Sequence, residues 1–292
     1  MNDIPISIVI PTLGYECLNE TVSYLNNGPN RPKEIIVVIP EGFEVNAGFQ
    51  TFENVIILKS PLKGQVKQRI FGFKHATERY ILQLDDDIWI DQNNLSNLLE
   101  VLKKLDKKSA VAPAFLKKGT MESIYTYKNN FNSFINNIVH FFLLKSGWGL
   151  KKMGKVSLGG VNFGVNFNFT NEINYPCDWL AGGCVLHHSD QVYLDNFYPF
   201  EGKAYSEDLF HSFYLKKSGI NLYSNTKTFC HLDWPPEPRT RLVQREEKNV
   251  LKYFIKLSGR SLLRFKIYNY YLILIKVLNY LKKLKFIKKN HK

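Results

Sequence analysis

The sequence predicts an α/β protein whose N-terminal half is a doubly wound, Rossmann-like and mostly parallel sheet with helices on both faces. In this half, continuous apolar runs rich in β-branched residues alternate with segments whose apolar residues recur at helical spacing. Strands that are buried on both faces of a parallel sheet have this unbroken apolar character. The strand–helix alternation over residues 1–110 favours crossover connections between parallel strands. With 292 residues, 45% of them hydrophobic, the chain can bury such a sheet.

Four strands and two helices are expected in this half. The strands are residues 6–10, 34–39, 55–58 and 80–84. One helix follows Gly64, with Val66, Ile70 and Phe73 on one face, and the other follows Asp91, with Leu95, Leu98, Leu99 and Leu102 on one face. Ligands bind beyond the carboxyl ends of the strands in such sheets, so residues 11–12, 40–41 and 85–87 are the places to search.

The second half is expected to be less regular. The period-two alternation of residues 161–169 predicts a half-exposed strand. Residues 178–187 predict another strand, in which a glycine pair allows close backbone approach. Residues 115–155 mix Asn, Lys and aromatic residues without a clear period and carry no assignment.

A helix is predicted to begin after Ser206 and to end at Gly219. Ser206 is placed to cap it, and Glu207 and Asp208 favour its first turn because carboxylates stabilise a helix N-terminus. Leu209, Phe210, Phe213 and Tyr214 then form its apolar stripe.

The charge of the chain is concentrated at its C-terminal end. The net charge is +13, from 39 basic and 26 acidic residues. Residues 248–292 hold 13 Lys and Arg and no Asp or Glu, which leaves 26 basic and 26 acidic residues in the rest. We therefore expect a neutral globular domain over residues 1–240 and a basic amphipathic helical tail over residues 241–292.

Three interpretations of this tail are considered. It can lie on an anionic membrane surface, bind nucleic acid, or pack on the domain with a solvated basic face. We prefer the membrane surface and expect no nucleic-acid partner, because the neutral domain offers no basic groove.

The cysteines and the apolar segments indicate a cytoplasmic protein, peripheral on the inner face of the cell membrane. The four cysteines are far apart without a CxxC pair, which argues against a zinc ribbon or a disulfide framework. We expect no signal peptide, because the first residues lack a basic segment. The longest apolar stretch, residues 267–281, contains Lys276 and is too short to span a membrane comfortably.

Three adjacent carboxylates, Asp85, Asp86 and Asp87, follow the fourth expected strand. Neighbouring carboxylates repel one another, and a bound divalent cation relieves that repulsion. Mg²⁺ and Mn²⁺ prefer such oxygen ligands and keep positions open for phosphate oxygens. From the residues alone, a polar strand end with solvated acids is an equal alternative.

Further residues have both a chemical and a structural interpretation. Asp208 can act as a general base, or Glu207 and Asp208 can simply stabilise a helix start. His231 can be a third metal ligand or a hydrogen-bonded residue at a strand end. Trp179 can offer its indole face to a sugar ring or pack in the core.

Several of these segments, taken together, resemble a known family. ISIVIPT, EIIVV, the helix start at residues 65–69, YILQLDDD, GGCVL and SEDLFHSFYLKKSG occur in the order expected of a family 2 glycosyltransferase of the GT-A fold. The resemblance covers residues 5–235, and its most specific parts are the DDD triplet and the later Glu-Asp pair. It implies an inverting enzyme of the bacterial surface-polysaccharide type, with a nucleotide-sugar-binding half at 1–110 and an acceptor half at 111–240.

The resemblance also implies roles for individual residues. Asp85 and Asp87 correspond to the DxD motif, which holds Mn²⁺ or Mg²⁺ on the donor diphosphate, and Asp208 corresponds to the catalytic base. The positions expected to bind the nucleotide sugar are Pro11, Thr12, Glu41, Lys67, Arg69, Asp85 and Asp86. On the acceptor side we expect Trp179, Gly182, Gly183 and Glu207. The family usually has paired acids after its second strand, whereas this chain has Pro40-Glu41-Gly42.

The expected function is transfer of a sugar from a nucleoside-diphosphate sugar to a hydroxyl of a glycan or lipid-linked glycan. One alternative is a GT-A-shaped protein that binds glycan or membrane without catalysis. Another is a metal-dependent hydrolase; an inverting glycosidase would need two carboxylates ~6.5–9.5 Å apart. A nucleotidyltransferase is disfavoured, because no glycine-rich basic loop follows the first expected strand.

Overall fold

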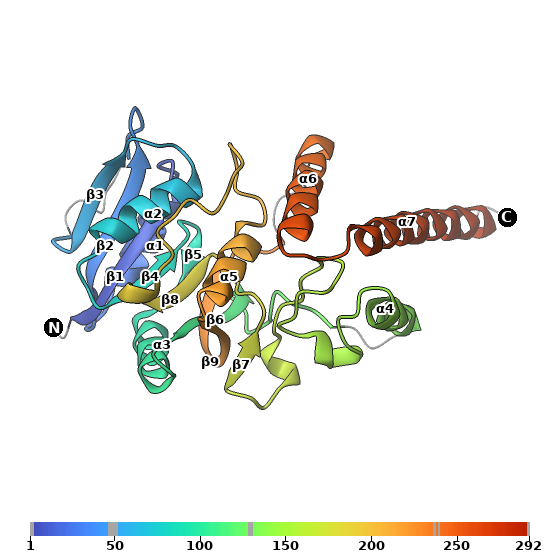
Figure 1. The fold of residues 1–292 in the computed structure, drawn as a ribbon, viewed down its shortest axis with the longest axis horizontal. Helices are drawn as coiled ribbons and strands as arrows, with labels where there is room; N and C mark the ends of the chain where they lie inside the picture. The colour runs from blue at the N-terminus through green and yellow to red at the C-terminus, as the bar shows by residue number, and fades with distance from the viewer. Residues whose placement is uncertain (1–2, 46–51, 128–130, 236–237, 239, 291–292) are drawn as a thin grey trace.

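The computed structural model describes residues 3–45, 52–127, 131–235, 238 and 240–290. Its centre is a nine-stranded mixed sheet with the strand order β3-β2-β1-β4-β8-β6-β9-β5, and β7 pairs with β9 (Figure 1). The strands are β1 (Ile4–Pro11), β2 (Pro32–Pro40), β3 (Val55–Ser60), β4 (Tyr80–Leu84), β5 (Ile88–Trp89), β6 (Ser109–Lys117), β7 (Asn174–Cys177), β8 (Cys184–His188) and β9 (Asn221–Leu232). The helices are α1 (Cys17–Asn26), α2 (Gln65–His75), α3 (Gln92–Lys104), α4 (Phe131–Phe142), α5 (Glu207–Lys217), α6 (Arg241–Leu257) and α7 (Leu262–Asn290).

The N-terminal half confirms the predicted parallel α/β arrangement. Strands β3, β2, β1 and β4 are parallel neighbours. Strand β8 then joins β4 and β6 in antiparallel pairs, whereas β6 and β9 are parallel. The carboxyl ends of β1, β2 and β4 therefore meet at one edge of the sheet, where the sequence analysis places ligands.

Alternate residues of these strands are buried on opposite faces, which explains their continuous apolar sequence. Val9, Ile36 and Val38 form one buried cluster with Phe73 of α2. The residues next to them along each strand face the other side of the sheet, in a cluster that includes buried residues of α1 and α3. Helices therefore cover both faces of the sheet.

Helix α2 approaches the sheet closely at Gly72. A Cβ atom there would overlap Val9 Cγ1 and lie 2.8 Å from Val38 Cγ2, so the position requires glycine. This close packing holds α2 directly against β1 and β2.

A second buried cluster joins α2, α5 and α6. It includes Val66 and Ile70 of α2, Phe210 of α5 and Phe254 of α6. Helix α6 therefore packs on the domain, whereas α7 extends away from it at the C-terminal end (Figure 1). Within the described residues, none of the helices combines the length and the apolar character needed to cross a membrane.

Several expectations for the second half were wrong. Residues 161–169 form a single bridge, Val156 to Asn162, and a short 3₁₀ helix (Phe167–Phe169) instead of a strand. The strand expected over 178–187 begins only at Cys184. Ser206 precedes α5 with φ 54°, and its side chain makes no capping hydrogen bond in the described structure. Residues 115–155, left unassigned, contain the end of β6 and all of α4.

Candidate active site

The side of the site where a donor is expected is built from the loops that follow β1 and β4. The Thr12 hydroxyl donates to the Asp86 carboxylate, and the Thr21 hydroxyl of α1 donates to the Asp86 carbonyl at 2.7 Å. The Gln68 amide of α2 donates to the carbonyls of Thr12 and Val38, both at 2.8 Å. The structure thus brings together two residues expected to bind the donor, Thr12 and Asp86, and holds their loops at fixed positions.

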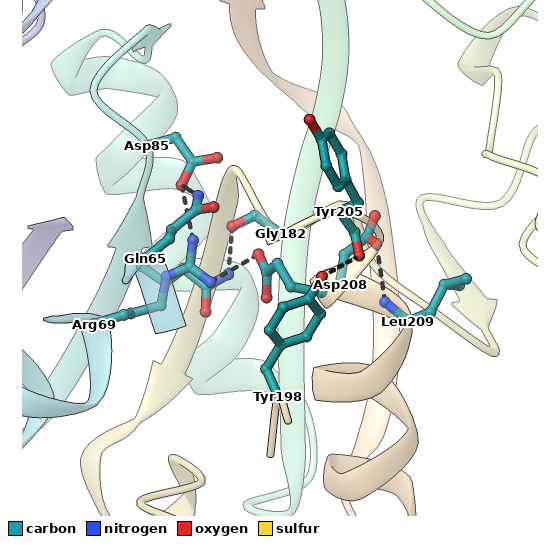
Figure 2. Close-up of polar contacts among 10 residues, drawn as sticks. Gln65, Arg69, Asp85, Gly182, Tyr198, Tyr205, Asp208 and Leu209 are labelled. Atoms are coloured by element: carbon teal, nitrogen blue, oxygen red, sulfur yellow. Dashed lines mark hydrogen bonds and ion pairs between the residues drawn. The ribbon is translucent and has the colours of Figure 1, made fainter. Parts of the chain in front are cut away.

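A buried ion-pair network connects three elements that are far apart in the sequence. Arg69 of α2 is only 1% exposed, and its guanidinium lies 2.8 Å from Asp85 Oδ1 and 2.8 Å from Glu207 Oε1 (Figure 2). The Gln65 amide donates to the same Asp85 oxygen at 3.0 Å. Arg69 therefore joins the end of β4 to the start of α5. Its own side chain is buried beneath the two carboxylates that it positions.

Gly182 and Gly183 lie between Asp85, at the end of β4, and the Glu207-Asp208 pair, at the start of α5. A Cβ atom at Gly182 would lie closer than 3.0 Å to Glu207 Oε1 and 3.3 Å from Asp208 Cβ. At Gly183 a Cβ atom would lie 3.4 Å from Asp85 Oδ2. The backbone of this pair therefore runs directly beside both Asp85 and Asp208, which confirms the close approach expected of the two glycines.

Hydrogen bonds hold the glycine segment in this place. The Gly183 carbonyl accepts from the Asp85 backbone N–H at 2.9 Å, and the Gly182 carbonyl accepts from the buried Gln83 amide. Because β4 carries both Gln83 and Asp85, the strand that presents the acid triplet also sets the position of the glycine pair.

Asp208 lies at the start of α5 in an environment that favours its protonated form. Burial, together with the charges of Glu207 and Asp85, raises the pKa of Asp208 to about 7, although a hydrogen bond from the Leu209 backbone N–H at 2.9 Å opposes this shift. A carboxylate with a pKa near neutral pH can accept a proton efficiently in a reaction. The raised pKa is compatible with a general base, and that role of Asp208 stays a prediction.

The acid triplet carries negative charge that the surrounding residues only partly compensate. Burial and the charges of Asp85 and Asp86 raise the pKa of Asp87 to about 6. Burial also raises the pKa of Asp86, although the hydrogen bond from Thr12 opposes this shift. A divalent cation beside these carboxylates would remove the repulsion, so their chemistry fits such an ion.

The proposed third metal ligand lies at the same edge of the sheet. His231 of β9 pairs with Trp89, two residues beyond Asp87, and its Nδ1 atom is buried without a hydrogen-bond partner among the described residues. Within the described ranges, however, no group of three or more His, Cys, Asp or Glu side chains is already arranged around a metal position. The contribution of His231 to metal binding stays a prediction.

Other expected site residues lie around the edge of this network. Pro11 ends β1, and Glu41 is exposed in the turn after β2. The Lys67 ammonium pairs with Glu201 at 2.8 Å. Both residues line a hollow between residues 63–67 and residues of the segment 196–204. Their contacts with a donor stay predictions.

Two residues that were expected to contact the acceptor, Trp179 and Glu207, are almost completely buried. Trp179 is 6% exposed, and its indole N–H donates to the Phe163 carbonyl at 3.0 Å. Its ring packs against Tyr125, so stacking of a sugar on the indole face would require its neighbours to move. Glu207 is also buried and uses one carboxylate oxygen for Arg69.

The sequence analysis missed the polar residues that position the site. Gln65, Gln68, Gln83 and Thr21 all make hydrogen bonds to site residues, as described above. Gln83 stands out in the sequence as the polar residue within the apolar strand YILQL, which is a signal that could have identified it. The others lie on helices where polar residues are common, and only the topology shows their partners.

Comparison with known proteins identifies the family. Residues 7–157, slightly more than half of the chain, match the family model described as glycosyl transferase family 2. The chain belongs to this family. The matched segment includes Arg69 and the acid triplet but ends before Gly182 and Asp208, so the assignment of those two residues depends on the geometry given above.

Solved structures with the same fold include two glycosyltransferases. GalNAc-T7 with UDP, GalNAc and Mn²⁺ has a TM-score of 0.58 and 14% identity, with 87% of this chain and 48% of that chain covered. S. aureus TarS 1–349 with UDP-GlcNAc has a TM-score of 0.51 and 12% identity, with coverages of 87% and 65%. This chain thus spans about half of the GalNAc-T7 chain and about two thirds of the TarS chain. The likeness shows the GT-A fold, and none of the curated proteins matches the sequence.

Proposed function

We propose that this protein is an inverting, divalent-metal-dependent glycosyltransferase. It would move a sugar from a nucleoside-diphosphate sugar to a hydroxyl of a glycan or lipid-linked glycan. The observation that carries the proposal is the glycine pair that separates Asp208 from Asp85, with Arg69 joining their two elements. This arrangement supports the proposal because Asp208, whose pKa is raised to about 7, lies beside the same glycine pair as the acid triplet.

In this proposal Asp208 accepts the proton of the acceptor hydroxyl as that oxygen attacks the anomeric carbon. Attack from the face opposite the departing diphosphate inverts the anomeric centre. Thr12 and Asp86 would contact the nucleotide part of the donor, because they lie together where the ends of β1 and β4 meet.

Asp85 and Asp87 would hold a divalent cation, with His231 as the further candidate. Such an ion supplies positive charge that stabilises the departing diphosphate. Arg69 acts as a positioning residue in this proposal, because it fixes the carboxylates of Asp85 and Glu207 without lying in the open part of the site.

The donor and the acceptor are proposed from different kinds of support. Two solved structures of the same fold contain UDP or UDP-GlcNAc, which supports a uridine-diphosphate sugar as the first donor to test. The basic tail supports a lipid-linked acceptor and a cytoplasmic location on the inner face of the cell membrane.

The test is a panel of sugar nucleotides with Mn²⁺ or Mg²⁺, in which nucleoside diphosphate release and thermal stabilisation are both measured. We expect one donor to raise the melting temperature only with a divalent ion and to release its diphosphate when an acceptor is added. Stabilisation without transfer to any acceptor, in both wild type and the Asp208→Asn variant, would favour a binding protein instead. Release of free sugar to water alone would favour a hydrolase.

A further inference from the structure

Helix α4 and helix α7 pack against each other although they lie far apart in the sequence. The Arg264 guanidinium donates to the Phe142 carbonyl at 3.2 Å, and Tyr268 Oη lies 3.3 Å from His140 Nε2. One turn further along α7, the Tyr271 hydroxyl donates to the Asn136 side-chain carbonyl at 2.7 Å. These contacts fix α7 to α4 over two helical turns.

Both helices leave apolar side chains exposed away from these contacts. On α4, Phe134, Ile138 and Phe141 recur at helical spacing, and the neighbouring Phe142 is 62% exposed. On α7 the large exposed residues are Leu263, Ile267, Tyr270, Leu272, Ile273, Leu274, Val277, Leu278, Tyr280 and Leu281. We call these side chains, together with Trp148, the α4–α7 surface.

Four aromatic rings form a cluster on the α4 side of this surface. Trp148 makes edge-on contacts with Phe134 and Phe141, at centroid distances of 5.8 and 6.0 Å, and Phe141 contacts Phe142 at 5.0 Å. All four side chains are more than one third exposed. An exposed aromatic cluster of this kind marks an interaction site, and aromatic rings favour the interface between water and lipid.

The two sequence segments that contribute the α4–α7 surface carry charge of one sign. Residues 123–171, which contain α4, hold five Lys and no Asp or Glu. Residues 248–292, which contain α7, hold 13 Lys and Arg and no acid. The two longest acid-free stretches of the chain therefore contain the two helices that pack together here.

We infer that the α4–α7 surface binds an anionic lipid bilayer as a single unit, with the aromatic cluster of α4 inserted beside α7. This inference builds on the membrane contact proposed above for the tail, and it adds a part of the domain itself. The apolar stretch 267–281 spans about 22 Å as a helix, less than the ~30 Å of a hydrocarbon core, so it would lie within the interface. Lysines of both segments would remain at the lipid headgroups.

The charge and the chemistry of the surface favour lipid over other occupants. A second copy of this chain would bring two strongly basic, acid-free surfaces together, which repel each other. Nucleic acid would pair with the lysines but leave the exposed Phe, Leu and Ile side chains in water. An anionic bilayer satisfies both the positive charge and the apolar side chains.

The test compares binding to phosphatidylcholine vesicles with and without anionic phosphatidylglycerol, by co-sedimentation in the absence of donor. We expect Phe142→Asp on α4 and Leu274→Asp on α7 each to weaken binding to the anionic vesicles by about tenfold or more. Met121→Asp is the matched control, because Met121 is also 62% exposed but lies outside the surface, and it should bind as wild type does.

Three outcomes would overturn the inference in different ways. If Leu274→Asp weakens binding and Phe142→Asp does not, the tail alone binds and α4 has no part. If neither variant binds anionic vesicles more weakly than Met121→Asp, or if the wild-type protein does not bind them, the surface is not a membrane site. Melting temperatures verify that each variant is folded, and diphosphate release measured without vesicles shows separately whether the proposed enzymatic function holds.

Discussion

Gly182→Ala should strongly reduce transfer while leaving the fold intact, because Gly182 faces the two carboxylates of α5. The new Cβ atom would lie closer than 3.0 Å to Glu207 Oε1, where ordinary contacts are 3.4–4 Å. The carboxylate cannot simply turn away, because Glu207 is buried and its Oε1 atom is held by Arg69. Glu207 and the adjacent Asp208 must then shift by about 1 Å, and a displacement of that size costs on the order of 100-fold in rate.

Gly183→Ala is the matched control for this prediction. Its Cβ atom would lie 3.3 Å from Ile88 and 3.4 Å from Asp85 Oδ2, so its neighbours need to move by only a few tenths of an ångström. The assay is kcat/KM for sugar transfer, with the melting temperature as the measure of folding. Activity of Gly182→Ala within about threefold of wild type, or an equal loss in both variants, would refute the reasoning.

Three further predictions concern the charges of the site. Arg69→Met should destabilise the protein by about 3–5 kcal/mol in denaturant unfolding, because it leaves the buried Glu207 carboxylate without its ion-pair partner and removes one of the two donors to Asp85 Oδ1; adding Glu207→Gln should restore part of the loss, and no rescue would argue against the pairing. The kcat/KM of transfer should rise with pH and level off above about 7, as the Asp208 carboxyl loses its proton; a flat profile between pH 5 and 8 would exclude it as the titrating base. Removal of divalent ions with a chelator should abolish diphosphate release, and Mn²⁺ should restore it; full activity in the chelator would remove the metal from the proposal.

The N-terminal half was predictable because local and global signals agree there. Strands β1, β2 and β4 are buried on both faces, so each appears as an apolar run, whereas the edge strand β3 is only partly buried. The acid triplet follows directly from the strand Tyr80–Leu84. The segments where ligands were expected, at the strand ends, therefore lie together at one edge of the observed sheet.

Residues 161–169 show why alternation alone misled the analysis. At one of their polar positions, the Asn166 side chain hydrogen-bonds backbone groups instead of lining a strand. The Asn166 side chain accepts from the Asn168 backbone N–H at 2.9 Å and donates to the Tyr125 carbonyl at 2.6 Å. Asn side chains that satisfy the backbone in this way compete with strand pairing.

Strand β6 was hidden by a proline in its middle. Pro113 argues against a central strand, because it cannot donate a ladder hydrogen bond. The structure accommodates it at an irregularity, where the register between β6 and β9 shifts between Ala112 and Ala114. Such a bulge depends on the partner strand and has no signal in the local sequence.

The sequence offers signals for the residues of the candidate site but none for the connections between them. The roles expected of Arg69 and Glu207 were contacts with donor and acceptor, whereas the structure pairs Arg69 with both Glu207 and Asp85. That pairing joins α2, β4 and α5, and it follows from the topology of the sheet and not from any spacing along the chain.

Asp208→Asn tests the central claim most directly, because it removes the proposed base and keeps the shape of the side chain. Donor binding is measured by calorimetry with Mn²⁺, and transfer is measured as glycosylated product, in the same preparation. The account predicts donor affinity within about twofold of wild type and a loss of transfer of at least about 100-fold. Transfer at the wild-type rate in this variant would contradict the account.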